Sequence, residues 1–347
     1  MINQIKLKLD KTIASLPQIF QKSYPFKSFS PFLFSTITDY SLRKGKRLRP
    51  LLFILSYAAH ANKRITPQLG ILPQSIYTSA AGLELIHNFM LIHDDIIDHS
   101  NKRRWQSSLH VLFNQKIGKN QKNKFTGEDM GIIAGDVLFS IALDLFFSIK
   151  ANPQSKETAL HYLLRIAALT GCGQFEELLL TTQPFEKIAL EDIHKIYDLK
   201  TAWYTFAAPL CLGAILAGAS SQEVSVLEKY GRAIGQAFQI RDDIIGMFSN
   251  HNNSGKSCLT DLQESKRTIL IFYAFQNADS KNRKTIKSIF AKNRVNQKDL
   301  KIIRKIIIDT GSLLQAEADI LRLEKKAASI LNRSCINLEF KALIQGL

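Results

Sequence analysis

The spacing of apolar residues is the feature that most constrains the fold of this chain. Apolar side chains recur every three or four positions in most long segments, for example in Glu191–Lys200, Glu223–Ile240 and Leu300–Asp309. This is the period of amphipathic helices. Nine prolines and 17 glycines in 347 residues are few for a strand-and-turn architecture or for long linkers. We therefore predict an all-α fold, with residues 1–347 in a single domain.

Three polar segments are expected to be loops, and none is long enough to be a linker between domains. They are Lys116–Gly127, Ser249–Ser257 and Ala278–Lys284. The N-terminus has no continuous apolar core of a signal peptide. The longest apolar run, Phe206–Ala219, is shorter than the roughly 18 residues that a membrane span needs.

Cysteine usage and charge narrow the class of protein further. Cys172, Cys211, Cys258 and Cys335 lie far apart, without the spacing of zinc ligands, so reduced thiols in a cytoplasmic, water-soluble protein are expected. The formal net charge of +16 suits nucleic acid, a membrane surface or a small polyanionic substrate, and does not choose among them.

Two similar acidic segments stand out within apolar surroundings. The first, Ile92–Asp98, reads IHDDIID, and the second, Ile240–Gly246, reads IRDDIIG. On a helix, Asp94 and Asp98 lie one turn apart on one face, and His87 shares that face two turns earlier. A solvated acidic cluster is the plain alternative, but the preceding apolar run and the second copy argue against it. The two acidic helices could face each other across a pocket.

Carboxylates that share one helix face repel each other unless a cation lies between them. Mg²⁺ prefers oxygen ligands and is usually held by one or two carboxylates together with substrate phosphates. Zinc would call for cysteine or histidine ligands, which these segments do not provide as a set. The acidic pairs therefore predict magnesium as the cofactor.

Four basic segments accompany the acidic pairs. They are Lys44–Pro50 (KGKRLRP), Asn101–Trp105 (NKRRW), Lys200–Thr201 and Gly255–Thr268 (GKSCLTDLQESKRT). Guanidinium groups bind phosphate in a bidentate manner, and lysine adds a point charge. Each segment alone could simply solvate a helix end. Beside the paired aspartates, however, they indicate a substrate that carries a diphosphate.

With these motifs in order, the sequence resembles the trans-isoprenyl diphosphate synthases, also called polyprenyl synthetases. The matching segments read GKRLRP, ELIHNFMLIHDDIID, RRWQSSLH, GEDMGIIAGDVLF, LKTA, GQAFQIRDDIIG and GKSCLTDLQESKRT, over about residues 40 to 275. The resemblance implies the isoprenoid synthase helical bundle around a central cavity. It also implies a magnesium-dependent prenyltransferase of isoprenoid biosynthesis, a homodimer, which joins isopentenyl diphosphate head to tail to an allylic diphosphate.

The same resemblance implies a role for individual residues. Magnesium would be bound by Asp94, Asp98 and Asp242, with Asp243 nearby. The allylic diphosphate would be held by Arg103, Lys200 and Lys256, with help from Lys266. The isopentenyl diphosphate site would comprise Gly45, Lys46, Arg49, His87 and Arg104. Thr201 and Gln239 would direct oxygen dipoles at the developing carbocation. The catalytic set is Asp94, Asp98, Asp242, Lys200 and Arg103.

The chain departs from the family pattern at three positions. Gly246 stands where many members have a third aspartate, which leaves Asp242 as the main metal ligand of the second motif. Trp105 replaces the usual glycine after the two arginines, and Ser265 stands where glycine is common.

Phe89 and Met90, one turn before Asp94, are the residues expected to limit product length. At 100° per residue Met90 lies on the carboxylate face and Phe89 about 140° away. An aromatic residue at position 89 resembles the synthases that stop at twenty carbons. Geranylgeranyl diphosphate is therefore the expected product, and a farnesyl or a longer polyprenyl diphosphate is the alternative. Phe89 could also serve only to pack the core.

Other functions remain open at this point. A class I terpene cyclase shares the fold, and a silent partner subunit would lack activity of its own. A nucleic-acid-binding protein would explain the charge but not the aspartates, and no nucleic-acid partner is expected. Lys281–Lys305 holds ten Lys or Arg against one acid, and either contacts anionic membranes peripherally or is a solvated basic face.

Overall fold

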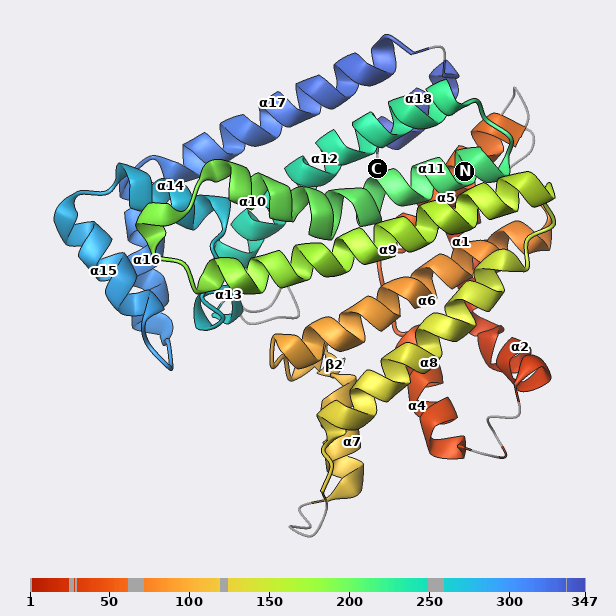
Figure 1. Ribbon diagram of the computed structural model, residues 1–347, viewed down its shortest axis with the longest axis horizontal. Coiled ribbons are helices and arrows are strands. Elements are labelled where there is room, and N and C mark those ends of the chain that lie inside the picture. The colour runs from red at the N-terminus through yellow and green to blue at the C-terminus, as the bar shows by residue number, and fades with distance from the viewer. Residues whose placement is uncertain are drawn as a thin grey trace. The chain divides into compact units, whose positions relative to one another are not determined.

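The chain folds almost entirely into helices, as the spacing of its apolar residues predicts (Figure 1). The structure is a computed structural model that describes residues 2–24, 28, 30–61, 72–118, 124–248, 259–334 and 336–346. The density of internal contacts divides the chain into two compact units, which are described separately. The first comprises Met1–Leu160 with Gly213–Ala219, and the second His161–Leu212 with Ser220–Leu347. The single domain over 1–347 stays a prediction.

The first unit is organised around a long central helix, α6 (Gln74–Ile97), which packs along α8 (Gly127–Phe147) (Figure 1). Its other elements are α1 (Ile2–Ala14), α2 (Leu16–Ser23), α4 (Pro31–Leu42), α5 (Leu48–Ala61), β1 (Lys102–Arg103), β2 (Gln106–Ser107), α7 (Leu109–Ile117) and the start of α9 (Pro153–Thr181). The end of α11 (Ala208–Leu216) also belongs to this unit.

Gly82 explains how closely α6 and α8 approach each other. A Cβ atom at this position would lie 2.8 Å from the backbone nitrogen of Phe146 and 2.9 Å from the carbonyl oxygen of Ala142. Only glycine therefore permits this packing. The N-terminus of α8 is fixed by a capping box, in which Thr126 and Asp129 each bond the backbone of the other.

The second unit packs α12 (Ser221–Phe248) between η2 (Tyr197–Ala207) and α17 (Ser312–Asn332). Its other elements are the remainder of α9 and α11, η1 (Phe185–Lys187), α10 (Leu190–Ile196), α13 (Thr260–Gln263), α14 (Ile269–Asn277), α15 (Ser280–Phe290), α16 (Gln297–Asp309) and α18 (Leu338–Gln345).

The element η2 is a π-helix, a wide turn that is rare in proteins and is often found at functional sites. Two glycines of α12 allow its backbone to come close. A Cβ atom on Gly231 would lie 2.5 Å from the Cα of Ala207, and one on Gly235 would lie 2.5 Å from the Cα of Ala202.

One predicted loop is wrong in part. The segment Ala278–Lys284 enters α15, whose N-terminus is capped by the Asp279 side chain accepting a hydrogen bond from the backbone N–H of Asn282 at 2.7 Å. The polar residues there cap and solvate a helix start. The described part of Lys116–Gly127 connects α7 to α8 as predicted. Ser249–Ser257 lies outside the described residues, as do Cys258 and Cys335, while Cys172 and Cys211 are free thiols.

By length and apolar composition alone, two helical segments among the described residues could cross a membrane. They are Gly127–Phe147, with 44% of the tested window buried, and Leu190–Leu216, with 83% buried. Core helices of globular proteins meet the same criteria, so two such segments are a weak sign of a membrane span.

Candidate active site

The three aspartates at the end of α6 have different surroundings. The backbone N–H of Asp98 donates to the carbonyl of Asp94 at 2.8 Å, which confirms that these two residues lie one helical turn apart. Asp95 is fully buried and accepts hydrogen bonds from Nε of Arg103 at 2.7 Å and from the hydroxyl of Tyr40 at 3.3 Å. Asp95 is therefore committed to bonds within the protein, on a side of the helix about 100° from Asp94.

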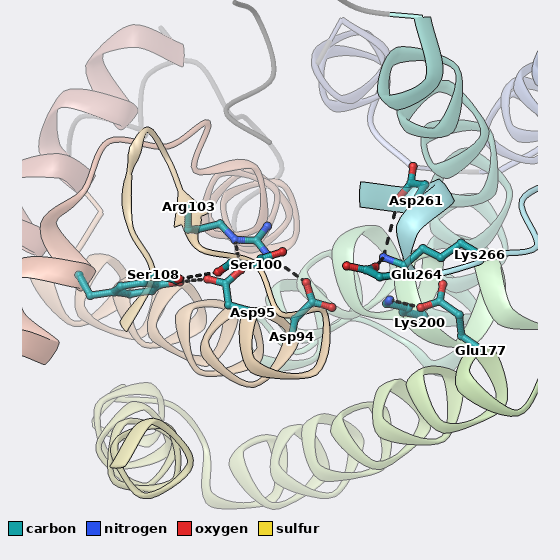
Figure 2. A network of polar contacts seen from close by, with 11 residues as sticks. Asp94, Asp95, Ser100, Arg103, Ser108, Glu177, Lys200, Asp261, Glu264 and Lys266 are labelled. Atoms are coloured by element: carbon teal, nitrogen blue, oxygen red, sulfur yellow. Dashed lines mark hydrogen bonds and ion pairs between the residues drawn. The ribbon is translucent and has the colours of Figure 1, made fainter. Parts of the chain in front are cut away.

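Arg103 connects the acidic helix to a small hairpin (Figure 2). Its Nη2 donates to Asp94 at 3.0 Å, and the same guanidinium contacts Asp95. Arg103 pairs with Gln106 across the hairpin. The two residues between them, Arg104 and Trp105, both have positive φ, 54° and 68°, as a type I′ turn requires. Asn and Gly are preferred in such turns because they adopt positive φ most easily. The positive φ at position 105 therefore explains why glycine is usual there in the family.

Arg104, the next residue in the hairpin, binds a different acidic group. Its Nη2 donates to Oε1 of Glu84 at 3.1 Å, and Nη1 of Arg47 donates to the same oxygen at 2.6 Å. Glu84 is only 2% exposed. A Cβ atom on Gly45 would lie 3.3 Å from the Arg104 guanidinium, so the GKRLRP segment and the hairpin meet at this point.

His87, one turn after Glu84 on α6, lies in a strongly positive field. Burial lowers its pKa well below the ordinary value, and the charges of four arginines, Arg49, Arg104, Arg103 and Arg47, lower it further. The imidazole is therefore neutral at neutral pH. Arg47 and Arg104 share the buried carboxylate of Glu84, and Arg47 also lies 3.5 Å from the carboxylate of Asp10. Guanidinium groups gathered around a neutral ring suit an anionic ligand.

In the second unit, Asp242 and Asp243 differ in burial in the same way as Asp94 and Asp95. Asp242 is exposed, whereas Asp243 is 7% exposed and bonds to the Tyr197 hydroxyl and to Nε2 of Gln239, the latter at 2.8 Å. Burial and then the charges of Asp261 and Asp242 raise the pKa of Asp243 to about 8. A cation near this cluster would favour the ionised form.

The predicted pair Thr201 and Gln239 is brought together. The Thr201 hydroxyl donates to Oε1 of Gln239 at 2.6 Å, and the amide of Gln239 then donates to Asp243. The Thr201 hydroxyl uses its hydrogen in this bond. The lone pairs of its oxygen therefore point away from Gln239, as an interaction with a cation requires.

The lysines of the second unit have acidic partners (Figure 2). Nζ of Lys200, on the π-helix, donates to Oε2 of Glu177 on α9 at 2.6 Å. Nζ of Lys266 lies 2.8 Å from Glu264 and 3.8 Å from Asp261. Lys256 lies outside the described residues. Asp94 and Asp98 belong to the first unit and Asp242 to the second, so the opposition of the two acidic helices stays a prediction.

Comparison with known proteins identifies the family. The sequence profile described as polyprenyl synthetase matches residues 31–307. The chain belongs to the polyprenyl synthetase family.

Relatives of known activity agree with this assignment. The chain is 38% identical over 250 residues to the short chain isoprenyl diphosphate synthase of Methanothermobacter thermautotrophicus, over 71% of this chain and 67% of the relative. It is 31% identical over 327 residues to the geranylfarnesyl diphosphate synthase of Aeropyrum pernix, over 92% and 93% of the two chains.

A solved structure agrees as well. The crystal structure of geranylgeranyl pyrophosphate synthase from Corynebacterium glutamicum, complexed with isoprenyl diphosphate and magnesium, matches with a TM-score of 0.83 and 28% identity, and the match covers 99% and 96% of the two chains. This likeness supports the predicted all-α isoprenoid synthase fold of this polyprenyl synthetase.

The polar groups of this polyprenyl synthetase are of the kind that magnesium uses. Among the residues that the structure describes, no group of three or more His, Cys, Asp or Glu side chains could hold a metal ion unaided. Asp94 and Asp98 nevertheless offer carboxylate oxygens one turn apart, and Mg²⁺ completes its coordination with water and substrate phosphates. The carboxylate oxygens of Asp94 and Asp98 are of the type that magnesium binds, although Asp98 is only 6% exposed. Magnesium as the cofactor, with Asp94, Asp98 and Asp242 as its ligands, stays a prediction.

Phe89 has an aromatic environment that the sequence did not reveal. Its ring centroid lies 4.8 Å from that of His93 on α6 and 4.8 Å from that of Phe139 on α8. Phe89 and Met90 are both half-buried. Phe139 therefore limits the movement of the Phe89 ring.

Several residues of this polyprenyl synthetase site were missed by sequence reasoning. Glu84 and Arg47 complete the arginine cluster, Tyr40 and Asp95 hold Arg103, and Tyr197 holds Asp243. Three of them had a signal in the sequence: Arg47 lies in KGKRLRP, Asp95 lies in IHDDIID, and Glu84 precedes His87 by one turn on the predicted helix. Lys46 and Arg49 flank Arg47; the former is exposed and the latter half-buried.

Proposed function

We propose that this prenyltransferase is a short-chain isoprenyl diphosphate synthase that joins isopentenyl diphosphate to allylic diphosphates, with geranylgeranyl diphosphate as its product. One observation carries the proposal. The consecutive residues Arg103 and Arg104 reach two different polar clusters, one at Asp94 and Asp95 and the other at Glu84 and Arg47. A condensation of two diphosphates needs two such anion sites side by side.

The two clusters suit two different diphosphates. The cluster at Asp94 and Asp98 offers carboxylates that need a metal before they can bind an anion, and Arg103 adds a donor beside them. The cluster around His87 is rich in arginine and suits a diphosphate that binds directly. We assign the first to the allylic substrate and the second, with Gly45, Lys46, Arg49, His87 and Arg104, to isopentenyl diphosphate.

The reaction begins with loss of diphosphate from the allylic carbon. Magnesium, when bound, supplies Lewis acidity to the departing diphosphate. As the family resemblance implies, Arg103, Lys200 and Lys256, with help from Lys266, would neutralise the charge that develops on it. Thr201 and Gln239 would direct oxygen dipoles at the allylic cation. We propose that Asp242 serves the same magnesium-dependent step.

The double bond of isopentenyl diphosphate then attacks the cation, a carbon–carbon bond forms, and a proton leaves. The released diphosphate takes this proton, so the reaction needs no base from the protein. His87 stays neutral among its arginines and positions the isopentenyl diphosphate. Water would quench the cation, so the reaction requires a site from which water is excluded.

Phe89 supports geranylgeranyl diphosphate as the product. Its ring is held between His93 and Phe139, and a ring so restrained can stop the growing chain. The relatives that the chain resembles include geranylgeranyl and geranylfarnesyl diphosphate synthases. We further propose a homodimer in the cytoplasm, as the family resemblance implies.

A product-length assay tests the proposal. The purified chain is incubated with Mg²⁺, isopentenyl diphosphate and, in turn, dimethylallyl, geranyl or farnesyl diphosphate, and the products are separated by chromatography. We expect a twenty-carbon product from all three, and none after chelation of the metal. A product formed without isopentenyl diphosphate would indicate a cyclase. Inactivity with every primer would indicate a silent partner subunit.

A further inference from the structure

The solvent-facing side of α16 carries an exposed basic and apolar stripe. Six exposed residues share an arc about 120° wide at 100° per residue. They are Lys298, Lys301, Ile302, Lys305, Ile308 and Asp309, whose carboxylate pairs with Lys305. Ile302 is 42% exposed and Ile308 is 57% exposed. The opposite side of the helix is buried through Leu300, Ile303, Ile306 and Ile307, so the core of the unit is complete without the two exposed isoleucines.

The lysines of this α16 stripe differ in their partners. Lys305 pairs with Asp309 at 2.7 Å. Within the described residues, the ammonium groups of Lys298 and Lys301 form no hydrogen bond or ion pair. The preceding α15 and its connection to α16 add exposed Lys281, Lys284 and Arg294. In the part of the chain that the structure describes, Lys298 and Lys301 therefore place two unpaired positive charges beside the exposed aliphatic side chains of the stripe.

We propose that the α16 stripe docks on an anionic lipid bilayer. Lys298 and Lys301 would contact the phosphates of the headgroups, while Ile302 and Ile308 enter the boundary between headgroups and acyl chains. Each lysine near an anionic surface contributes about a fivefold increase in partitioning. The stripe has aliphatic residues where a nucleic-acid surface would have aromatic ones that stack on bases, and this favours the membrane.

The inference stands on this surface alone and does not require the proposed function. If that function holds, the two fit together, because a prenyl diphosphate has an apolar tail and an anionic head like the lipids themselves. Docking through α16 would then bring the enzyme to the membrane in which its product dissolves.

Sedimentation with lipid vesicles tests the proposal. The full chain is mixed with vesicles of phosphatidylcholine alone or of phosphatidylcholine with phosphatidylglycerol, at low and at high ionic strength. We expect binding only to the anionic vesicles, and weaker binding at high salt because screening shortens the reach of the lysines. The variant Lys298→Glu/Lys301→Glu should bind at least tenfold more weakly. The variant Ile302→Ser/Ile308→Ser should also weaken binding, and this loss should persist at low salt.

The matched control is Lys325→Glu/Lys326→Glu on α17, where both lysines are exposed and the change in net charge is the same. We expect this control to bind as the unchanged chain does. Glutamate near the N-terminus of α16 is favourable to the helix, so the charge-reversed variant should keep its helicity by circular dichroism. Equal loss in the control, equal binding to both kinds of vesicle, or no binding to either would each overturn the proposal.

Discussion

Asp198 binds the Arg232 guanidinium with both carboxylate oxygens, at 2.6 and 3.0 Å, and so joins the π-helix η2 to α12. The same carboxylate accepts hydrogen bonds from the indole of Trp203 at 3.1 Å and from Gln236 at 3.3 Å. Asp198 precedes Lys200 and Thr201 by two and three residues. This network therefore fixes the part of the π-helix that presents two of the proposed site residues.

Replacement of Asp198 should shift Lys200 and Thr201, although Asp198 is not itself a proposed substrate-binding residue. Asp198→Asn loses the ion pair with Arg232 but keeps the size of the side chain. We expect a loss of about 2 kcal/mol in the free energy of unfolding, and a fall in kcat larger than the rise in KM, because Thr201 no longer faces the cation correctly. Chemical denaturation and steady-state kinetics measure the two effects. Arg322→Ala, which breaks the more exposed pair with Asp319, is the control; an equal fall in kcat there would refute the positioning role.

Glu84→Gln should make the stability of the enzyme depend on anions. The change keeps the hydrogen-bond acceptor but leaves Arg47 and Arg104 without their shared negative charge. We expect a loss of about 3 kcal/mol in the free energy of unfolding. A bound anion would restore part of this loss, so inorganic diphosphate should raise Tm more in the variant than in the unchanged enzyme. Glu186→Gln, at the exposed pair with Lys287, should show neither effect. If inorganic diphosphate raised Tm equally in all three proteins, this would count against an anion site at this cluster.

Trp105→Gly should stabilise the enzyme. Trp105 has φ of 68° and is 62% exposed, so it strains the backbone and buries little apolar surface in return. Glycine adopts this conformation without strain, and we expect a gain of about 1 kcal/mol in the free energy of unfolding. Trp105→Ala loses the same ring but keeps the strain, and should show no gain. Chemical denaturation measures the free energy of unfolding of both variants. An equal gain in the two would mean that the exposed ring, and not the backbone conformation, destabilises the enzyme.

Phe89→Ala should lengthen the product. Removal of the ring opens space next to Phe139, so we expect prenyl chains beyond twenty carbons as the main products by chromatography. Phe147→Ala on α8 removes an identical ring, one that contacts Phe146 edge to face instead, and should leave the product unchanged. A product distribution that stays the same in Phe89→Ala would leave Phe89 with a packing role only.

The sequence alone determined the class of fold and the local geometry of the acidic motif. Helical spacing of apolar residues is a local property, and the four-residue interval from Asp94 to Asp98 places both on one face in any helix. The order of the motifs was enough to point to the family. Where the structure describes the predicted loops, local polarity misled at Ala278–Lys284, because a helix start and a loop use the same polar residues.

The tertiary structure decided which of the neighbouring charges are available to a substrate. Asp94 and Asp95 are adjacent and chemically identical, yet only Asp95 is enclosed, because Tyr40 and Arg103 come to it from other elements. Glu84 likewise meets Arg47 and Arg104 only after folding. Burial and pairing depend on residues that are distant along the chain, whereas periodicity does not, and this is why the helices could be foreseen and their partners could not.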